Sequence, residues 1–495
     1  MPPPERATVL VASNRGPISI TTDEHGHYRA QRGGGGLVSG LSALGHRPEY
    51  AGTQALWVCA ALSETDRQAA RSAPGGRLDQ SSELAEHLES TSPGVQMLDI
   101  PVETFTGAYT TIANSVLWFV HHLLFDIPNH PQFDARFRER WEDYVAYNAA
   151  FGEALASAAA PGARVFVQDY HLALVPRMLR ERRPDLRVSH FSHTPWAPVE
   201  YFRLLPPDIR VQLLDGMLGA DHLGFHTQGW ARAFTECCTA ELPGEVAVSA
   251  TNGWEIRRGG RVVRVGVHPL GVDAAGLRSR AAEADVAERR AELSEAVGDR
   301  KLLVRIDRTE LSKNIVRGLA GFRELLQRHP EWRRAVTHLA FAYPSRTDVP
   351  EYRSYTESVR ELAASINSEF GTEDWTPVLL EVRDDFARSL AAYQLADVLV
   401  VNPIRDGMNL VAKEGPILSE RDSVLVLSTG AGAVEELGED ALLVHPYDVS
   451  ATADALDTAL RMPPGERQKR RERLADRAAQ MPPHRWFTEQ LTHLG

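Results

Sequence analysis

Short apolar runs alternate along most of the chain with longer stretches in which apolar residues recur every three or four positions. The short runs predict strands and the longer stretches predict amphipathic helices. The predicted strands are residues 8–13, 55–60, 96–101, 164–168, 188–191 and 223–225, and then 302–306, 336–341, 378–382, 398–401, 424–427 and 442–444. This alternation predicts an α/β fold with parallel sheets covered by helices on both faces.

The alternation is interrupted between the two groups of strands. Residues 252–271 predict a β-hairpin with Gly259-Gly260 as its turn, and residues 275–297 predict one charged, alanine-rich helix. The predicted domains are therefore an N-terminal domain at residues 1–275, a C-terminal domain at 276–480, and a final helix within 481–495 that crosses back to the first domain.

Candidate chemistry follows the predicted strands, because open parallel sheets bind ligands beyond the carboxyl ends of their strands. The residues at these places include the cations Arg15, Arg308, Lys313 and Arg346, together with Asp169, His193 and Asp406. Arg308 and Lys313 share one strand-to-helix loop, which suits a diphosphate. The alternative is that they are ordinary solvated loop charges.

Residues 402–414 leave a predicted strand and enter a predicted helix. Asp406 is expected near the helix start, where exposed backbone N–H groups can hold an anionic or hydroxyl-rich ligand. Glu414 follows eight residues later, a little over two helical turns, so a helix would direct both carboxylates to one side. The pair then suits the hydroxyl groups of one elongated ligand. The alternative is a helix cap and an unrelated surface acid.

Composition narrows the class of protein. The chain has 495 residues, 43% hydrophobic and 24% charged, which excludes disordered and small disulfide-stapled proteins. Its net charge of −12 argues against nucleic acid and membrane as partners, so a phosphorylated substrate requires a local group of cations. Three cysteines without a metal or disulfide spacing, no apolar stretch approaching 18 residues and no signal peptide at the start predict a cytoplasmic location.

Known cofactor and metal motifs are missing from the sequence. The glycine clusters at residues 33–36 and 430–432 do not have the GxGxxG spacing, which argues against a nicotinamide-dependent oxidoreductase. The sequence contains no HExxH motif and no two aspartates separated by a single residue. We therefore expect neither a cofactor nor a catalytic metal.

Together these segments resemble the trehalose-6-phosphate synthase family of retaining glucosyltransferases, and most of all its actinobacterial branch. The string at residues 405–414 is the most specific match, and residues 114–118, 169–171 and 344–346 add support. The resemblance runs from about Val9 to the final helix. It implies the GT-B architecture, in which two Rossmann-like domains face each other and the active site lies in the cleft between them.

The resemblance also implies a role for each candidate residue. The acceptor, glucose 6-phosphate, would be held at its phosphate by Arg15, Tyr109, Trp118 and Arg346 and at its hydroxyl groups by Asp169. The donor would be held by Gly35, Gly36, His193, Arg308, Lys313, Asp406, Gly407, Met408, Asn409, Leu410 and Glu414. The catalytic residues would be Arg308, Lys313, His193, Asp169 and Asp406.

The implied reaction is a metal-independent transfer of glucose, with retention, from a nucleoside-diphosphate-glucose to the 1-hydroxyl of glucose 6-phosphate. Arg308 and Lys313 would stabilise the leaving diphosphate. Residues 381–386 fall where relatives bind the base, and a carboxylate there can pair with guanine N1–H and its amine. Because the actinobacterial branch includes users of GDP-glucose, we favour GDP-glucose over UDP-glucose.

Two alternatives within the fold stay open. Some relatives are pseudo-glycosyltransferases that couple cyclitols, and a non-catalytic sugar-phosphate sensor is also conceivable, although Arg308, Lys313 and Asp406 are all retained. The sequence departs from the commonest family pattern at three places: Gln168 stands where many members have His, Asn314 stands where Gly is frequent, and Thr309-Glu310 replaces a Leu-Asp pair. The sequence leaves open whether the chain forms a homo-oligomer.

Overall fold

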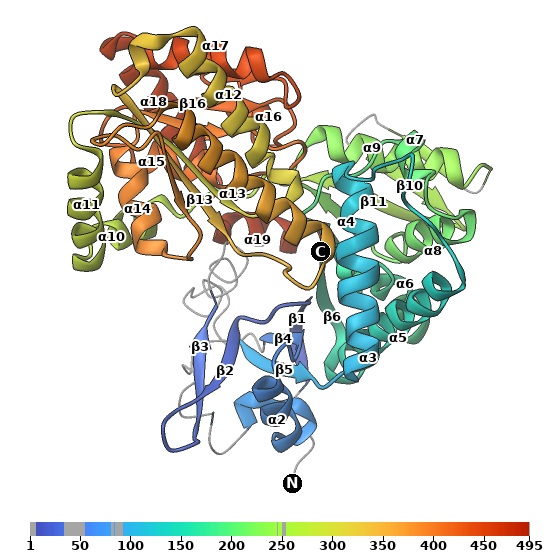
Figure 1. Ribbon diagram of the computed structural model, residues 1–495. Coiled ribbons are helices and arrows are strands. Elements are labelled where there is room, and N and C mark those ends of the chain that lie inside the picture. Colours follow the sequence, from blue (N-terminus) through green and yellow to red (C-terminus); the bar gives the residue numbers. More distant parts are fainter. Residues whose placement is uncertain are drawn as a thin grey trace. The chain divides into compact units, whose positions relative to one another are not determined.

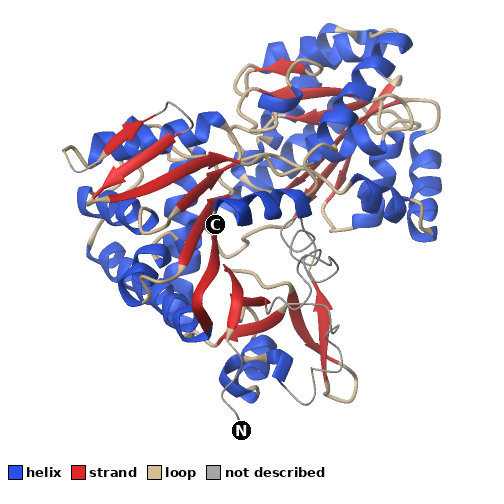
Figure 2. Cartoon of the chain, turned by 180° about the vertical axis from the view of Figure 1, so that it is seen from behind, coloured by secondary structure: helices blue, strands red, loops and turns tan. Residues whose placement is uncertain are grey.

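A computed structural model describes residues 6–33, 55–80, 84, 93–244, 246–249 and 254–494. The chain divides into two compact units (Figure 1). Unit 1 comprises Met1–Leu270 and Pro483–Gly495, and unit 2 comprises Gly271–Pro482. Within each unit the strands form a layer that helices cover (Figure 2), so the predicted α/β class with two Rossmann-like domains is confirmed.

Unit 1 is built on one large sheet. Its strands are β1 (Ala7–Ser13), β4 (Ala55–Ala60), β5 (Gly94–Leu98), β6 (Ala159–Gln168), β7 (Arg187–Ser192), β8 (His222–Phe225), β9 (Ala247–Ser249), β10 (Trp254–Arg258) and β11 (Arg261–Val267). The spatial order is β5-β4-β1-β6-β7-β8-β11-β10-β9, and only the last two strands are antiparallel to their neighbours. The first six strands therefore follow the Rossmann order 3-2-1-4-5-6.

The helices of unit 1 include several short segments. They are α2 (Glu64–Ser72), α3 (Val102–Phe105), the π-helix η5 (Thr106–Leu117), α4 (Trp118–His122), α5 (Ala135–Ala158), α6 (Val175–Arg182), α7 (Val199–Phe202), α8 (Pro207–Met217), α9 (Gln228–Glu241) and α19 (Pro483–His493). A separate hairpin joins β2 (Ile18–Thr22) to β3 (Tyr28–Arg32). The indole N–H of Trp486 on α19 donates to the carbonyl of His268 at 2.9 Å, which fastens the C-terminal helix to this unit.

Unit 2 repeats the same topology with a purely parallel sheet. Its strands are β12 (Lys301–Arg308), β13 (Val336–Tyr343), β14 (Val378–Glu381), β15 (Val398–Val401), β16 (Val424–Ser428) and β17 (Leu442–Val444), in the order β14-β13-β12-β15-β16-β17. Its helices are α10 (Ala274–Ala281), α11 (Ala284–Val297), α12 (Ile315–Arg328), α13 (Pro350–Phe370), α14 (Phe386–Leu395), α15 (Val411–Leu418), α16 (Val434–Leu437), α17 (Val449–Arg461) and α18 (Pro464–Ala478).

The period-two pattern of the strands places a core on each face of this sheet. On β15, Leu399 and Val401 join the apolar cluster that contains Leu390 of α14, whereas Val398 and Val400 join the cluster on the other face. A strand buried on both faces reads as a continuous apolar run, as these residues do. The packing fixes the strand ends, and with them the loops that follow.

Two local predictions have different outcomes. The predicted hairpin is confirmed, since Gly259 (φ 55°) and Gly260 (φ 77°) both adopt the left-handed conformation that a type I′ turn requires. The single helix predicted at residues 275–297 is wrong, because the chain breaks between α10 and α11. Arg280 before the break and Asp285 after it form two hydrogen bonds, at 2.8 and 2.6 Å.

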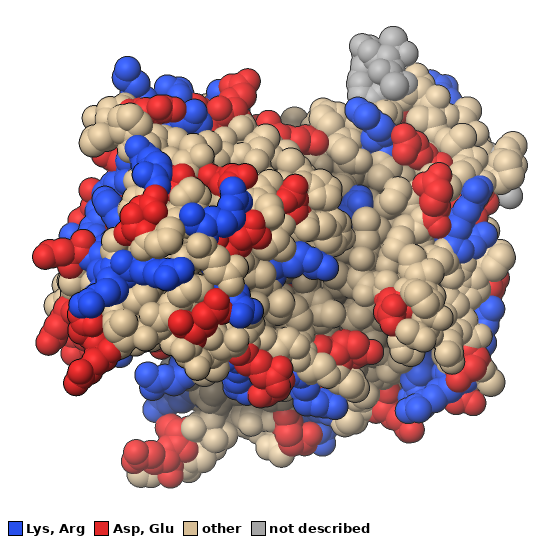
Figure 3. Space-filling model, turned by 45° about the horizontal axis from the view of Figure 1, so that its top comes forward, with Lys and Arg blue, Asp and Glu red and all other residues tan. Residues whose placement is uncertain are grey.

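The surface carries charges of both signs, and the cysteine thiols are buried. On the face drawn in Figure 3, acidic and basic side chains are interspersed. Cys59, Cys237 and Cys238 are buried free thiols. Among the helices that the structure describes, none has both the length and the apolar character needed to cross a bilayer.

Candidate active site

In both sheets the first strand lies beside the fourth, and the strand order runs outward from this pair in opposite directions. Ligands of open α/β sheets bind at this switch point. In unit 1 the switch point lies between β1 and β6, whose carboxyl ends lead to Arg15 and Asp169. In unit 2 it lies between β12 and β15, which lead to Arg308 and Asp406. The topology therefore places candidate residues at the binding edge of each sheet.

Asp169 is held firmly between β6 and β7 in unit 1. It has a positive φ of 72°, a strained conformation for a residue with a side chain. Its backbone N–H donates to the carbonyl of Phe191 at 2.7 Å, and its Oδ1 accepts the backbone N–H of His193 at 3.1 Å. These contacts preset the carboxylate at the sheet edge beside the second predicted catalytic residue of this unit.

His193 is a neutral imidazole with a defined tautomer. Its Nε2 lies 2.9 Å from Oε1 of Gln168, an acceptor, so Nε2 carries the proton and Nδ1 is the acceptor. Burial, and secondarily the neighbouring His190, lower the pKa of His193 to about 3. Gln168, the residue that departs from the family pattern, therefore sets which nitrogen of His193 can accept a hydroxyl proton.

The aromatic candidates of unit 1 gather around the segment that follows Asp169. Tyr109, on the π-helix η5, stacks on His171 with ring centroids 5.5 Å apart and an angle of 16°. Trp118, the first residue of α4, lies 5.8 Å from the ring of Tyr170. The structure therefore packs Tyr109 and Trp118 against the two residues that follow Asp169 in the chain.

Arg15 is exposed just beyond the end of β1. The preceding residue, Asn14, accepts the hydroxyl of buried Tyr147 at 2.6 Å. Tyr147 in turn contacts Phe105, whose ring stacks 5.2 Å from that of Tyr109. The loop that carries Arg15 is thus anchored to the same cluster.

In unit 2, Lys313 and Asp406 form an ion pair across the switch point. The Nζ of Lys313 lies 2.5 Å from Oδ2 of Asp406, and the Asn409 amide donates to the same oxygen at 3.1 Å. Burial lowers the pKa of Lys313, but the surrounding carboxylates, Asp406 above all, outweigh this and raise it. Lys313 is consequently a fixed positive charge at neutral pH.

A second cation group surrounds the buried carboxylate of Glu310. Its Oε1 lies 3.2 Å from Arg308 and accepts the Ser345 hydroxyl at 2.8 Å, and its Oε2 lies 4.0 Å from Arg346. Burial raises the pKa of Glu310, but Arg308, Arg346 and Lys313 overcome this and lower it to about 2. The Arg308 side chain is 54% exposed, so its guanidinium is anchored at one side and open to solvent.

Arg346 groups with the donor candidates in the structure. It follows β13 in unit 2, donates to the Tyr352 hydroxyl at 2.6 Å and shares Glu310 with Arg308. The other predicted acceptor residues, Arg15, Tyr109, Trp118 and Asp169, all belong to unit 1. Sequence reasoning did not single out Ser345 or Tyr352 as partners in this group.

The loop that carries Asp406 differs from the predicted helix start. Helix α15 begins only at Val411, and Asp406 is extended and bridged to Ala431, so the helical spacing from Asp406 to Glu414 is wrong. A Cβ on Gly430 would lie 2.1 Å from the carbonyl of Ile404, and one on Gly432 would lie 1.9 Å from the carbonyl of Gly407. The second glycine cluster thus lets two backbone segments approach each other closely.

Glu414 lies in the first turn of α15, as a candidate ribose ligand. Its Oε2 accepts the hydroxyl of Tyr393 at 2.9 Å, and burial raises its pKa. The backbone N–H of Glu414 donates to the carbonyl of Leu410 at 2.8 Å. Sequence reasoning missed Tyr393, which lies on another helix with no motif to mark it. Met408 and Asn409, in the loop between β15 and α15, are buried.

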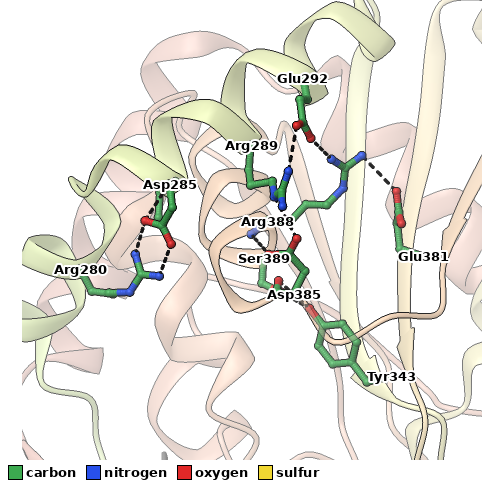
Figure 4. Close-up of polar contacts among 10 residues, drawn as sticks. Arg280, Asp285, Arg289, Glu292, Tyr343, Glu381, Asp385, Arg388 and Ser389 are labelled. Atoms are coloured by element: carbon green, nitrogen blue, oxygen red, sulfur yellow. Dashed lines mark hydrogen bonds and ion pairs between the residues drawn. The ribbon is translucent and has the colours of Figure 1, made fainter. Parts of the chain in front are cut away.

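The segment after β14, which the sequence assigned to the base, is held by a charged network (Figure 4). Glu381 pairs with Arg388 at 3.0 Å, and Arg388 also binds Glu292 at 2.8 Å. Asp385 accepts the backbone N–H of Arg388 at 2.9 Å and pairs with Arg289 at 3.0 Å. Glu381 and Asp385 therefore have structural partners, whereas Asp384 is exposed and pairs with no residue that the structure describes.

Two predicted donor residues, Gly35 and Gly36, lie outside the described residues. The described candidates form two sets: Arg15, Tyr109, Trp118, Asp169 and His193 in unit 1, and Arg308, Lys313, Arg346, Asp406, Gly407, Met408, Asn409, Leu410 and Glu414 in unit 2. Each set combines cations with hydroxyl-binding groups at a switch point.

This fold and these sites agree with comparisons to known proteins. The model of glycosyltransferase family 20 matches residues 7–495, and the chain belongs to this family. A trehalose-6-phosphate synthase of Mycolicibacterium vanbaalenii is 35% identical over 477 residues, 94% of this chain and 91% of that protein. The resemblance to trehalose-6-phosphate synthases, actinobacterial ones included, is thereby confirmed, and the chain is a glycosyltransferase of that family.

Two further relatives define the extent of the likeness. A bifunctional trehalose-6-phosphate synthase/phosphatase of Thermoproteus tenax is 33% identical over 486 residues. The match covers 97% of this chain but only 62% of that protein. The crystal structure of a UDP-forming α,α-trehalose-phosphate synthase from Burkholderia vietnamiensis is 29% identical, covers 99% of both chains and has a TM-score of 0.81. The fold is GT-B.

Proposed function

We propose that the chain is a trehalose-6-phosphate synthase, which transfers glucose from a nucleoside-diphosphate-glucose to the 1-hydroxyl of glucose 6-phosphate with retention. The observation that carries the proposal is the group at the switch point of unit 2. There, Arg308 and Lys313 supply the charge for a diphosphate, while Asp406 and Glu414 supply acceptors for sugar hydroxyls. In this proposal residues 276–480 are the donor domain and residues 1–275 the acceptor domain.

The residues present account for the transfer chemistry without a metal ion. Breaking the anomeric bond places negative charge on the leaving diphosphate and leaves a sugar with oxocarbenium character. Arg308 and Lys313 are prearranged charges that stabilise the first, in the manner of a preorganised electrostatic site. The departing phosphate oxygen then accepts the proton of the attacking 1-hydroxyl. His193 is neutral, so it accepts a sugar hydroxyl without repelling the developing positive charge.

The acceptor assignment rests on the cluster of unit 1 and on Arg346. Arg15, Tyr109, Trp118 and Arg346 would hold the phosphate, and Asp169 would bind the sugar hydroxyls. A structure from Burkholderia xenovorans, 26% identical with a TM-score of 0.82, is in complex with glucose-6-phosphate. A structure from E. coli, 26% identical with a TM-score of 0.82, is bound with UDP-2-fluoro glucose. Both ligands are small phosphorylated molecules, which supports substrates of this class.

For the donor base we favour guanine. Glu381 and Asp385 are occupied by Arg388 and Arg289, whereas Asp384 is exposed and offers a carboxylate to the N1–H and amine of guanine. Uracil has no equivalent pair of donors. Relatives from Dictyostelium discoideum and Schizosaccharomyces pombe are named UDP-forming, which makes UDP-glucose the alternative donor.

One experiment tests the whole assignment. The protein is incubated with glucose 6-phosphate and a panel of nucleotide-glucoses, and the product and its anomeric configuration are identified by NMR. An α,α-linked disaccharide phosphate is expected, with the highest turnover from GDP-glucose. Donor hydrolysis alone or an inverted product would refute synthase activity. Transfer to a cyclitol phosphate but not to glucose 6-phosphate would identify the cyclitol-coupling alternative, and binding without turnover a sensor. The buried free thiols agree with the cytoplasmic location that we propose.

A further inference from the structure

Three histidines converge in unit 1, and none of them is assigned to a substrate. His222 begins β8, His268 follows β11, and His493 is the last residue of α19. One ring nitrogen from each lies within 4.8 Å of those of the other two. The Nε2 atoms of His222 and His268 are 3.2 Å apart. The ring of His493 lies 5.0 Å from that of His222 and 5.2 Å from that of His268.

A glycine makes room for this arrangement. Gly266, on β11, lies beneath the two buried imidazoles, and a Cβ at this position would lie 2.6 Å from Nε2 of His268 and 2.7 Å from Nε2 of His222. Both distances are shorter than the closest approach of two non-bonded atoms. Any other residue would push the two ring nitrogens out of the place where they meet.

The chemistry of the three rings suits metal coordination. A neutral imidazole has one ring nitrogen with a lone pair to donate, and His222 and His268 are both buried where their Nε2 atoms meet. The Ser189 hydroxyl lies 3.1 Å from Nδ1 of His222. A partner on the far nitrogen is the support that metal-bound histidines have in proteins, and it directs Nε2 into the cluster.

The surroundings leave space for a further ligand. His222, His268 and His493 line a pocket of about 680 Å³, whose wall also includes Arg264 and Glu255. Arg264 and Glu255 are directly opposite each other in the register of β10 and β11, so their charges offset each other at this wall. His493 is exposed, which gives an ion a route to the two buried rings.

We propose that His222, His268 and His493 bind one divalent transition-metal ion, with Zn²⁺ the best fit, and that the ion fastens α19 to the sheet of unit 1. Imidazole nitrogens prefer Zn²⁺ and its neighbours to Mg²⁺ or Ca²⁺. Two nitrogens about 2.0–2.1 Å from a tetrahedral Zn²⁺ are about 3.3 Å apart, which the 3.2 Å spacing of His222 and His268 matches. The pocket supplies the fourth position for water.

This ion has a structural role, distinct from the metal-independent transfer proposed above. Its ligands come from the start of β8, the segment after β11 and the end of the last helix, so no short motif in the sequence marks it. Its consequence is mechanical: α19 is joined to its unit by Trp486 at one end of the helix and would be joined by the ion at the other.

The test uses the full chain without an affinity tag. Metal content is measured on the protein as isolated, and Zn²⁺ and Co²⁺ are then titrated into protein stripped by a chelator. We expect one ion per chain, a tetrahedral Co²⁺ spectrum, and a Tm that rises with Zn²⁺. His493→Ala removes one exposed ligand, so the fold is retained. It should weaken Zn²⁺ binding by about 100-fold or more, because losing even a supporting contact costs about 10–100-fold.

The matched control is His329→Ala, which removes a histidine from a second, more exposed group with Glu331 and Asp457. Tight binding should survive this change. The proposal is overturned if the wild-type protein binds no stoichiometric Zn²⁺, if His493→Ala binds like the wild type, or if His329→Ala abolishes the tight site. Gly266→Ala provides a second variant, and circular dichroism verifies that each variant is folded.

Discussion

The ammonium group of Lys313 lies 2.5 Å from Oδ2 of Asp406, although the two residues are 93 positions apart. Lys313 follows the first strand of the unit 2 sheet and Asp406 follows the fourth, so the pair closes the switch point between β12 and β15. The 3.1 Å bond from Asn409 directs the same carboxylate oxygen. A nucleotide-sugar bound at this switch point would therefore meet the Lys313 ammonium and the Asp406 carboxylate, two groups that hold each other in position.

We predict that Lys313→Met and Asp406→Asn are strongly non-additive. Each single change leaves a largely buried group, 15% exposed in either case, without its charged partner, whereas the double change removes both charges. Residues that share one ion pair have coupling energies of about 0.5–3 kcal/mol. Binding of the nucleotide-glucose to the four proteins of this cycle, measured by calorimetry, should give a coupling within that range. Losses that simply add would show that the two side chains act independently.

Arg308 is predicted to be essential for turnover and dispensable for folding. Its side chain is 54% exposed and pairs with the carboxylate of Glu310. Arg308→Ala should reduce turnover by about 100-fold or more, by analogy with the loss of one preorganised donor. The control is Arg323→Ala, which removes an exposed arginine that pairs with Glu369 in the same unit. Near-normal turnover of Arg308→Ala would remove this residue from the leaving-group role.

Glu310 is predicted to position the cations around it. Glu310→Gln keeps the size of the side chain but removes the charge that Arg308 and Arg346 share. The KM for the donor should therefore rise more than kcat falls, because the guanidinium groups lose their anchor. A matched change at exposed Glu351, Glu351→Gln, should alter neither constant. An unchanged KM in Glu310→Gln would contradict the positioning role.

The same substitution should change the response of stability to acid. Glu310 has a folded pKa of about 2 and an ordinary value of 4.5, so the folded state binds fewer protons than the unfolded state between these pH values. The resulting stability is fully present above pH 4.5 and is lost as the pH falls towards 2. Acidification from pH 5 to pH 3 should therefore lower the Tm of Glu310→Gln less steeply than that of the wild type, as measured by thermal unfolding.

The sequence could predict much of this site because parallel strands end at a common edge. Arg15, Asp169, Arg308 and Asp406 were all recognised as residues that follow strands, and the structure places them at the two switch points. The conformation around Asp406 could not be predicted. Its sequence is compatible with a helix, and the distant backbone of residues 430–432 bonds to Asp406 and holds it extended.

Contacts between separate elements were likewise beyond the sequence. Nothing in the pattern indicates that Tyr393 donates to Glu414, that Arg346 shares Glu310 with Arg308, or that three histidines meet in unit 1. Each contact depends on how helices and loops pack once the sheet has formed. Motif and periodicity reasoning therefore locates candidate residues, whereas their partners have to be read from the packed structure.

Asp384 is predicted to set the preference for the donor base. Asp384→Asn removes the carboxylate that we assign to the N1–H and amine of guanine, so it should lower the GDP-glucose to UDP-glucose ratio of kcat/KM by about 10-fold or more, the loss expected for a hydrogen bond to a charged group. Activity with UDP-glucose should change little. Glu373→Gln, an exposed acid elsewhere in unit 2, is the control. An unaltered ratio would exclude Asp384 from base recognition.

The last prediction concerns His338, a buried histidine of β13. No residue that the structure describes hydrogen-bonds to either of its ring nitrogens, and its ring packs edge-on against Phe322 at 5.1 Å. Burial, together with nearby Arg305, lowers its pKa to about 3 from an ordinary 6.5. Between these pH values the unfolded chain binds a proton that the folded chain does not, so His338 makes the fold less stable as the pH falls below 6.5.

His338→Leu should therefore stabilise the protein, by about 1–3 kcal/mol at pH 7 from the removal of unpaired polar groups and by about 1.4 kcal/mol more for each pH unit below 6.5. For a unit of this size, 1 kcal/mol corresponds to a rise in Tm of about 2–4 °C. Calorimetry at pH 7, 6 and 5 measures the gap between variant and wild type. The difference in stability between His338→Leu and the wild type should widen as the pH falls. The control His25→Ala changes an exposed histidine, and its stability should stay close to that of the wild type at each pH. A gap that stays constant would mean that His338 does not lose its proton on folding, and the burial argument would fail.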